Sequence, residues 1–339
     1  MENHLPMSQV RQGMKAVVLA GGYATRLWPI TRHRPKMLLP LEDGTVIDRI
    51  LTELEAEPRI DQIFISTNRR FQSTFTEFLA ARPYEKVELS VEQTVEENEK
   101  MGVIGALAQL IEREGIDDDL FVIGGDNLFS FEISSFLQFF DHHGHPCLAA
   151  YDVGSRDAAR SYGLVTLDGE RVVDFQEKPD EPESTLVSIA CYAFPRSVVP
   201  ALGRYLVGDN NPDEPGWFIQ WLYEREPVYA FDFDGTWFDI GTPDAYLDAL
   251  AWSLDGDQSV AEGATVIDSS LGETVLIGAG ATVRNSDLER TIVFDNAIIE
   301  DATLSDSIVD EHATVVGVEL DAARVGAHSK ITGATNDGD

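Results

Sequence analysis

Two patterns of apolar and polar positions alternate along most of the chain. Short apolar runs, typical of buried strands, lie at 16–20, 62–67, 87–91, 120–123, 147–153 and 188–194. Between them, apolar residues recur at helical spacing at 45–56, 71–79 and 101–111. Strands that alternate with helices predict an α/β fold with a mostly parallel sheet covered on both faces. In such sheets ligands gather at the carboxyl ends of the strands.

The pattern changes near Gln258. From Val266 to Ile331 apolar anchors lie five or six residues apart, and short residues fill the spaces between them. This period predicts a parallel β-helix with three short strands in each of about four coils. We therefore expect an N-terminal extension at 1–13, an α/β domain at 14–255 and a β-helix at 258–335. Because exposed coil ends invite pairing, we expect the β-helix to stack protomers into a homo-oligomer or to cap the α/β domain.

Glycines end the first predicted strand. Gly21 and Gly22 present backbone N–H groups that a phosphate can approach closely. Arg26 and Lys36 follow within about 15 residues, and they are cations of the types that neutralise phosphate. A tight turn with surface cations is the alternative interpretation. The segment is neither a dinucleotide fingerprint nor a Walker loop, because it lacks both Gly-x-Gly-x-x-Gly and Gly-Lys-Ser/Thr.

The whole segment 15–41, KAVVLAGGYATRLWPITRHRPKMLLPL, resembles the signature of the sugar-phosphate nucleotidyltransferases, G-G-x-G-T-R-L-x-P-x-T-x-x-x-P-K-x-L-x-P. Ala24 stands where the family has glycine, and a positive φ there would cost alanine about 1 kcal/mol. Two later motifs are similar to the family's Y-G-V…F-x-E-K-P and W-x-D-x-G-T, at 162–179 and 237–242. Ala190 occupies another usual glycine, in the strand that matches the family's sugar pocket, and its methyl group would narrow that pocket.

This resemblance implies a Rossmann-like nucleotidyltransferase domain followed by a short left-handed β-helix, closest to the glucose-1-phosphate thymidylyltransferase and uridylyltransferase group. The implied reaction joins a nucleoside triphosphate, with dTTP or UTP favoured, to a sugar 1-phosphate, with glucose 1-phosphate favoured, and releases pyrophosphate. The resemblance implies catalysis by Arg26 and Lys36, Mg²⁺ binding by Asp126 and Asp239, sugar binding by Gly163, Glu177 and Lys178, and nucleotide binding by Leu19, Ala20, Gly21, Gly22, Thr25, Gln93 and Gly102.

The residues themselves leave other interpretations open. Asp126, behind two glycines at the end of a predicted strand, is placed to hold Mg²⁺ against a phosphate, but an Asx turn would also use an acid there. Asp239 could instead cap the helix that starts near Pro243. Gln93 lies farther from Gly102 than in the thymidylyltransferases, so the base stays open among thymine, uracil, guanine and adenine. Glu177 and Lys178 alone would predict only a solvated turn.

The amino-acid composition excludes some classes of binding partner. The chain has 59 acidic and 25 basic residues, a net charge of -34, which argues against nucleic acid and anionic membranes. Only 6 of the basic residues are lysine, and this skew indicates a salt-adapted surface, with an acidic mesophilic protein as the alternative. Cys147 and Cys191 form no paired motif, so we expect buried, reduced thiols. No apolar run reaches about 18 residues, so we expect a cytoplasmic protein.

Two other functions compete with an active transferase. One is a regulatory subunit that kept the fold and lost the chemistry. Such relatives typically lose a cation of the signature or an acid that binds the metal. This chain keeps both cations, Arg26 and Lys36, and both acids, Asp126 and Asp239. The other is an acyltransferase that uses the β-helix. His312 could be its base, although a lone histidine among acids is more often a solvated turn residue.

Overall fold

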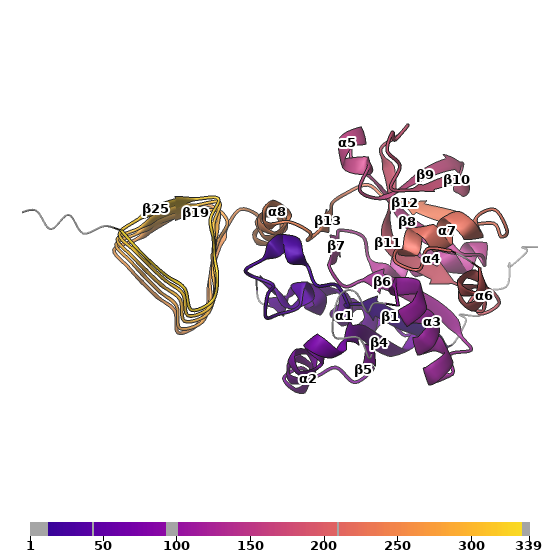
Figure 1. Ribbon diagram of the computed structural model, residues 1–339, viewed down its shortest axis with the longest axis horizontal. Coiled ribbons are helices and arrows are strands. Elements are labelled where there is room, and N and C mark those ends of the chain that lie inside the picture. The colour runs from indigo at the N-terminus through magenta and orange to yellow at the C-terminus, as the bar shows by residue number, and fades with distance from the viewer. Residues whose placement is uncertain (1–12, 43, 93–100, 209, 334–339) are drawn as a thin grey trace, which may run out of the picture. The chain divides into compact units, whose positions relative to one another are not determined.

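The computed structural model describes residues 13–42, 44–92, 101–208 and 210–333 (Figure 1). They form two compact units, which are each described by themselves. Unit 1 contains the chain up to Gly21 and Ile50–Trp237, and unit 2 contains Gly22–Arg49 and the chain from Phe238 onward. Residues 22–49, which carry most of the signature, therefore group with the C-terminal part of the chain. The domain boundaries expected from the sequence stay a prediction.

Unit 1 is built on a nine-stranded sheet in the order β5-β4-β1-β6-β11-β8-β12-β10-β9. The strands are β1 (Met14–Leu19), β4 (Ile60–Asn68), β5 (Val87–Glu92), β6 (Asp119–Gly124), β8 (Cys147–Asp152), β9 (Gly163–Asp168), β10 (Arg171–Glu177), β11 (Leu186–Phe194) and β12 (Tyr229–Asp232). The first four strands in this order pair in parallel. The rest is mixed, because β11 runs antiparallel to β6, β8 and β9. The carboxyl ends of β1 and β6 therefore lie side by side.

Helices cover this sheet. They are α1 (Val46–Ala56, which runs from unit 2 into unit 1), α2 (Gln72–Ala80), α3 (Val103–Glu114), α4 (Ile133–His143), α5 (Arg156–Ala159), α6 (Ala201–Val207) and α7 (Pro215–Leu222). A 3-10 turn, η3 (Arg69–Phe71), precedes α2, and β7 (Asn127–Phe129) follows β6. The sequence analysis did not anticipate α4, α5, α6 and α7. α3 packs against both α6 and α7, and this contact buries Leu107, Leu202 and Phe218.

Unit 2 ends in the predicted β-helix, whose triangular section is visible in Figure 1. Its three parallel sheets are β14-β17-β20-β23-β26, β15-β18-β21-β24-β27 and β16-β19-β22-β25. The strands are β14 (Gln258–Val260), β15 (Thr265–Ile267), β16 (Ser270–Leu271), β17 (Val275–Ile277), β18 (Thr282–Arg284), β19 (Asp287–Glu289), β20 (Thr291–Val293), β21 (Ile298–Glu300), β22 (Thr303–Ser305), β23 (Ile308–Val309), β24 (Thr314–Val316), β25 (Glu319–Asp321), β26 (Arg324–Val325) and β27 (Lys330–Thr332). The predicted fold class is confirmed.

The corners of the β-helix share one backbone conformation. One corner falls on Gly280, Asn296, His312 and His328 in successive coils, and all four have positive φ. The exposed rings of His312 and His328 stack with centroids 4.9 Å apart. The interpretation of His312 as a turn residue is confirmed, and it offers no buried base for acyl transfer.

The rest of unit 2 is short elements and one helix: η1 (Thr25–Leu27), η2 (Lys36–Leu38), β2 (Pro40–Leu41), β3 (Gly44–Thr45) and α8 (Pro243–Leu254), preceded by β13 (Trp237–Asp239), whose first residue belongs to unit 1. The side chain of Thr242 caps α8 by accepting a hydrogen bond from Ala245 N at 3.2 Å. The alternative interpretation of Asp239 as the cap of this helix is therefore wrong.

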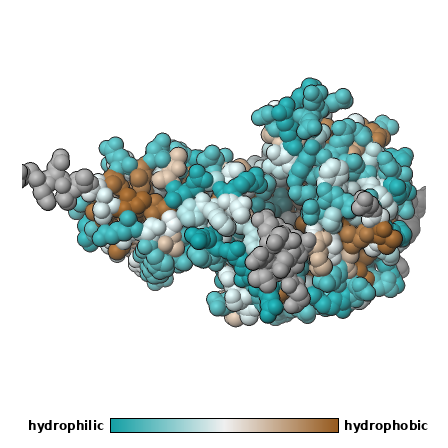
Figure 2. Space-filling view, in the orientation of Figure 1, coloured by the Kyte–Doolittle hydropathy of each residue, from teal (hydrophilic) through white to brown (hydrophobic). Residues whose placement is uncertain are grey.

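The surface agrees with the acidic composition. The face shown in Figure 2 is mostly hydrophilic, with an apolar group over the β-helix. Cys147 and Cys191 are free and buried, as predicted, and burial raises the pKa of both thiols. None of the helices in the described ranges has the length and apolar character needed to span a bilayer.

Candidate functional site

Side chains of β4 fix the glycine turn in unit 1. β1 ends at Leu19, and the next amide, Ala20 N, donates to Ser66 O at 2.7 Å. The side chains of Thr67 and Asn68 donate to the carbonyls of Ala20 and Gly21, at 3.0 and 2.9 Å. Both side chains are buried, so the carbonyls of this turn are held in place on the strand side. Sequence reasoning missed this pair, and its only signal was two polar residues at the end of an apolar strand.

The signature continues in unit 2 with a left-handed residue. Ala24 has φ 48° and ψ 46°, and Thr31 Oγ1 donates to its carbonyl at 2.8 Å. Alanine thus adopts a positive φ at this position, at a cost of about 1 kcal/mol. Ala24 leads into η1, which carries Thr25 and Arg26. Alanine therefore occupies a left-handed conformation of the kind that glycine adopts readily.

Three predicted residues meet in unit 2. Lys36 is buried, and its Nζ lies 3.4 Å from Asp239 Oδ1. Gly241 brings Arg26 to the same place, because a Cβ on Gly241 would lie 2.9 Å from Arg26 Nη2 and 3.5 Å from Asp239 Oδ2. Two cations thus lie beside one carboxylate, so the cluster carries a net positive charge. Such a cluster suits a polyphosphate that is shared with a metal ion.

Asp126 lies at the carboxyl end of β6 in unit 1. The amide of Gly125 donates to Leu19 O at 2.9 Å, so this turn sits against the end of β1. Gly124 leaves room for the turn, since a Cβ there would lie 2.9 Å from Asp126 Oδ1. The arrangement places an acid where parallel sheets bind ligands.

The residue after Asp126 contacts the last residue of unit 1. Asn127 is buried, and its Oδ1 accepts a hydrogen bond from the indole of Trp237 at 2.6 Å. Ser130 N donates to Thr236 O at 3.0 Å in the same stretch of unit 1. Sequence reasoning did not single out Asn127.

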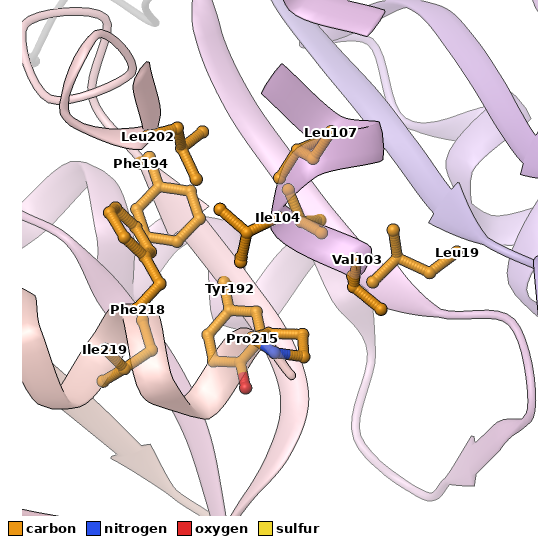
Figure 3. Close-up of a pocket in the computed structure, with 11 residues that line it drawn as sticks. Leu19, Val103, Ile104, Leu107, Tyr192, Phe194, Leu202, Pro215, Phe218 and Ile219 are labelled. Carbon is orange, nitrogen blue, oxygen red and sulfur yellow. The ribbon is translucent and has the colours of Figure 1, made fainter. Parts of the chain in front are cut away.

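The predicted base-binding residues are described only in part. Gln93 lies outside the described residues. Gly102 has φ +75°, and a Cβ on it would lie 2.4 Å from Pro212 O, so close packing alone requires glycine here. Leu19, which is a predicted nucleotide residue, and Val103, which follows Gly102, line one end of an apolar pocket, and Tyr192 lies across it (Figure 3). A nucleotide contact of Gly102 stays a prediction.

The predicted sugar residues of unit 1 surround a buried carboxyl. Glu177 ends β10 with 8% of its surface exposed, and its amide donates to Gln220 Oε1 at 2.8 Å. Gly163 and Gly216 make room for it, since a Cβ on either would approach Glu177 Oε2 within 2.8 and 1.6 Å. The interpretation of this residue as part of a solvated turn is therefore wrong.

Burial changes the acidity of Glu177. It raises the pKa of this carboxyl to about 7, while Lys178 lowers that pKa and Glu214 raises it. Lys178 itself has φ 47° and reaches Glu214 Oε1 at 2.5 Å. Ala190, the second alanine at a usual glycine, also keeps a positive φ of 55°. The sugar residues thus form one group at the carboxyl end of β10.

A metal ion fits the chemistry of the acids but is not enclosed by them. Nowhere in the described ranges do three or more His, Cys, Asp or Glu side chains group closely enough to hold a metal ion. Mg²⁺ binds through one or two carboxylates plus substrate phosphates and water, so Asp126 and Asp239 match the donors that it prefers.

Comparisons with known proteins give a family. Residues 15–255 match the family described as Nucleotidyl transferase. A Sulfolobus acidocaldarius protein described as a mannose-1-phosphate guanyltransferase is 28% identical, over 80% of this chain and 75% of its own length. The bifunctional protein GlmU of Methanocaldococcus jannaschii is 25% identical over 71% of this chain, which spans only 55% of that relative.

The fold has a counterpart among solved structures. A Bacillus anthracis protein described as a glucose-1-phosphate thymidylyltransferase, in complex with a sucrose, aligns with a TM-score of 0.61 and 24% identity. The alignment covers 72% of this chain and 97% of that protein. Because the family match extends over most of the chain and includes the glycine turn, both cations and both acids, the chain belongs to the nucleotidyl transferase family.

Proposed function

We propose that the protein transfers a nucleotidyl group from a nucleoside triphosphate to a sugar 1-phosphate, giving a nucleotide sugar and pyrophosphate. The observation that carries this proposal is the cluster of Arg26, Lys36 and Asp239 in unit 2. Glucose 1-phosphate with dTTP or UTP remains the favoured pair. The guanyltransferase relative supports mannose 1-phosphate and GTP as the pair to test against it.

The chain's own residues supply positioning and charge. The sugar phosphate oxygen attacks the α-phosphorus in line, so no protein nucleophile is needed. Lys36 neutralises the α-phosphate and the sugar phosphate, and Arg26 neutralises the leaving pyrophosphate. The glycine turn, held by Thr67 and Asn68, offers backbone donors to the triphosphate.

Mg²⁺ would be held by Asp126 and Asp239, and when bound it neutralises phosphate charge and orients the triphosphate. Asp239 also accepts from Lys36, and this contact keeps the lysine directed at the phosphates in the absence of substrate. Glu177 and Lys178 would bind sugar hydroxyls and the sugar phosphate, with Gly163 giving the sugar close access to the backbone.

Pyrophosphate release tests the proposal. The assay is run in molar KCl with Mg²⁺, pairing glucose 1-phosphate and mannose 1-phosphate with each of the four ribonucleoside triphosphates and dTTP. Sugar-dependent release with one base is expected, and it would identify both substrates. If no pyrophosphate is released with any of a wider panel of sugar phosphates, the regulatory subunit would be favoured instead. A profile across KCl concentrations also tests the expected salt adaptation, and sedimentation tests the expected homo-oligomer.

Asp126→Asn tests the metal assignment. The variant keeps the shape of the side chain and removes its charge, so turnover should disappear while the circular dichroism spectrum is unchanged. Glu181→Asn, at an exposed acid of the same unit, is the control and should keep wild-type turnover. Normal turnover of Asp126→Asn at saturating Mg²⁺ would remove Asp126 from the proposed site.

A further inference from the structure

A buried ion pair joins the signature segment to the β-helix within unit 2. Arg34 Nη2 lies 2.8 Å from Asp310 Oδ1 and 3.2 Å from Glu311 Oε2. The guanidinium also lies over the ring of Phe294, with its Cζ 4.8 Å from the ring centroid. Only 3% of the Asp310 side chain and 17% of the Arg34 side chain are exposed. The pair spans 276 residues of sequence.

The pair is built into a covered face of the β-helix. Asp310 follows β23, on the sheet whose core-facing residues include Val293 and Val309. Side chains that alternate with these core residues along the strands point away from the core and yet are buried; they are Leu276, Ile292 and Ile308. This face of the sheet is therefore covered. Arg34 lies beside the ends of two strands of this sheet, over Phe294 after β20 and against Asp310 after β23.

A second contact supports the same attachment. A Cβ on Gly326 would lie 3.0 Å from Pro29 Cβ, so the last coils of the β-helix touch the signature segment directly. Asp310 depends on this environment, since burial raises the pKa of its carboxyl and Arg34 lowers it. Without Arg34 the buried carboxylate of Asp310 would lose its main partner, which is costly for a buried charge.

Arg34 lies two residues before Lys36. Pro35 between them has φ -62°, and its ring restricts the backbone to this region. Lys36 then starts η2, and its buried side chain reaches Asp239. A short, stiff connection thus runs from the anchored guanidinium to the ammonium group. Because Pro35 fixes one of the few backbone rotations between the two side chains, a displacement of Arg34 is expected to move Lys36 as well.

We propose that Asp310 is a positioning residue: it anchors Arg34 and thereby holds Lys36 in its productive place, which makes the β-helix a working part of the transferase. The inference rests on the proposed function in assigning Lys36 to the phosphates. The anchoring itself can be measured without turnover.

Kinetics of two matched variants test the positioning role. Asp310→Asn removes the charge of the anchor, and Asp248→Asn removes the exposed pair between Asp248 and Arg290, which lie 2.6 Å apart in the same unit. We expect Asp310→Asn to lower kcat by about tenfold to a hundredfold with KM values changed by less than about threefold, because misplacement of a catalytic group reduces the rate. Asp248→Asn should match the wild type.

A double-mutant cycle separates positioning from general damage. In a Lys36→Gln background, Asp310→Asn should lower kcat by less than about twofold, because the group it positions is gone. An equal loss of kcat in both backgrounds would overturn the inference, and so would a fully active Asp310→Asn. A wild type that turns over no substrate pair would instead refute the proposed function.

Lysine labelling tests the anchoring whatever the activity. Mass spectrometry follows acetylation of Lys36 by acetic anhydride in the full chain, with Lys86 of unit 1 as the internal reference. Lys36 is buried in the wild type, so Asp310→Asn should raise its rate relative to Lys86 by severalfold, and Asp248→Asn should not. An unchanged ratio would show that the ion pair does not hold Lys36, and the inference would fail.

Discussion

Replacing Glu177 by glutamine should change how the stability of the protein depends on pH. The carboxyl is 8% exposed, and burial raises its pKa to about 7 from a usual value of 4.5. The folded protein therefore binds this proton more tightly than the unfolded chain does. The resulting stabilisation is fully present below pH 4.5 and is lost as pH rises through about 7. Glutamine has no proton to lose, so the variant escapes this loss.

The size of the effect follows from the shift in pKa. Each pKa unit corresponds to about 1.4 kcal/mol, so a shift of this size amounts to roughly 3 kcal/mol when the carboxyl is fully ionised. The free energy of unfolding of Glu177→Gln should thus rise relative to the wild type between about pH 4.5 and pH 7.5, by up to that amount. Above this window the difference should level off.

Urea unfolding followed by circular dichroism at fixed KCl measures this difference at each pH. Subtracting the free energy of unfolding of the wild type from that of the variant removes the contributions of the other carboxylates, because both proteins share them. Glu181→Gln, at an exposed position of the same segment, controls for the loss of one negative charge. A difference between Glu177→Gln and wild type that stays constant from pH 4.5 to pH 8 would refute the assignment of a buried, proton-binding carboxyl.

Three further variants test other features. Gly216→Ala should lower the free energy of unfolding by about 1–3 kcal/mol and raise the KM for sugar phosphate, because its Cβ would overlap the buried carboxyl of Glu177. Gly203→Ala in α6, which has open space around it, is the control in urea unfolding. Ala24→Gly should raise the melting temperature, since glycine relieves about 1 kcal/mol of left-handed strain; an unchanged or lower value would contradict this. Asn127→Ala should cost about 1–3 kcal/mol in the same unfolding assay, because it leaves a buried indole N–H unpaired, and an unchanged midpoint would refute that hydrogen bond.

The sequence predicts the elements of this fold well where apolar spacing is regular. β1 and α3 were predicted within a few residues, and the anchors of the β-helix, such as Val293 and Val309, lie in its core. The apolar helix α7 was missed, because a segment that is apolar on nearly all sides shows no periodicity to read. Local pattern therefore gives no signal for a helix of this kind.

The site was predictable only as far as its motifs reach. Arg26, Lys36 and Asp239 were named from the signature, and the structure brings them together in unit 2. Asn68 and Gln220 could not be found that way, since their roles depend on strands and helices that meet only in the fold. The Arg34–Asp310 pair is the extreme case, because no local pattern relates positions so far apart in the chain.

The corners of the β-helix bear on how such a tail can change in length over evolution. Leu271 and Val275 pair with Leu288 and Thr291. Three residues therefore separate the paired positions at this corner of the first coil, and two separate them in the next coil. The strands on either side keep their registers, so a single insertion is absorbed at the bend. Length can therefore drift at corners, or jump by whole coils, while the coil that carries Asp310 must stay opposite Arg34.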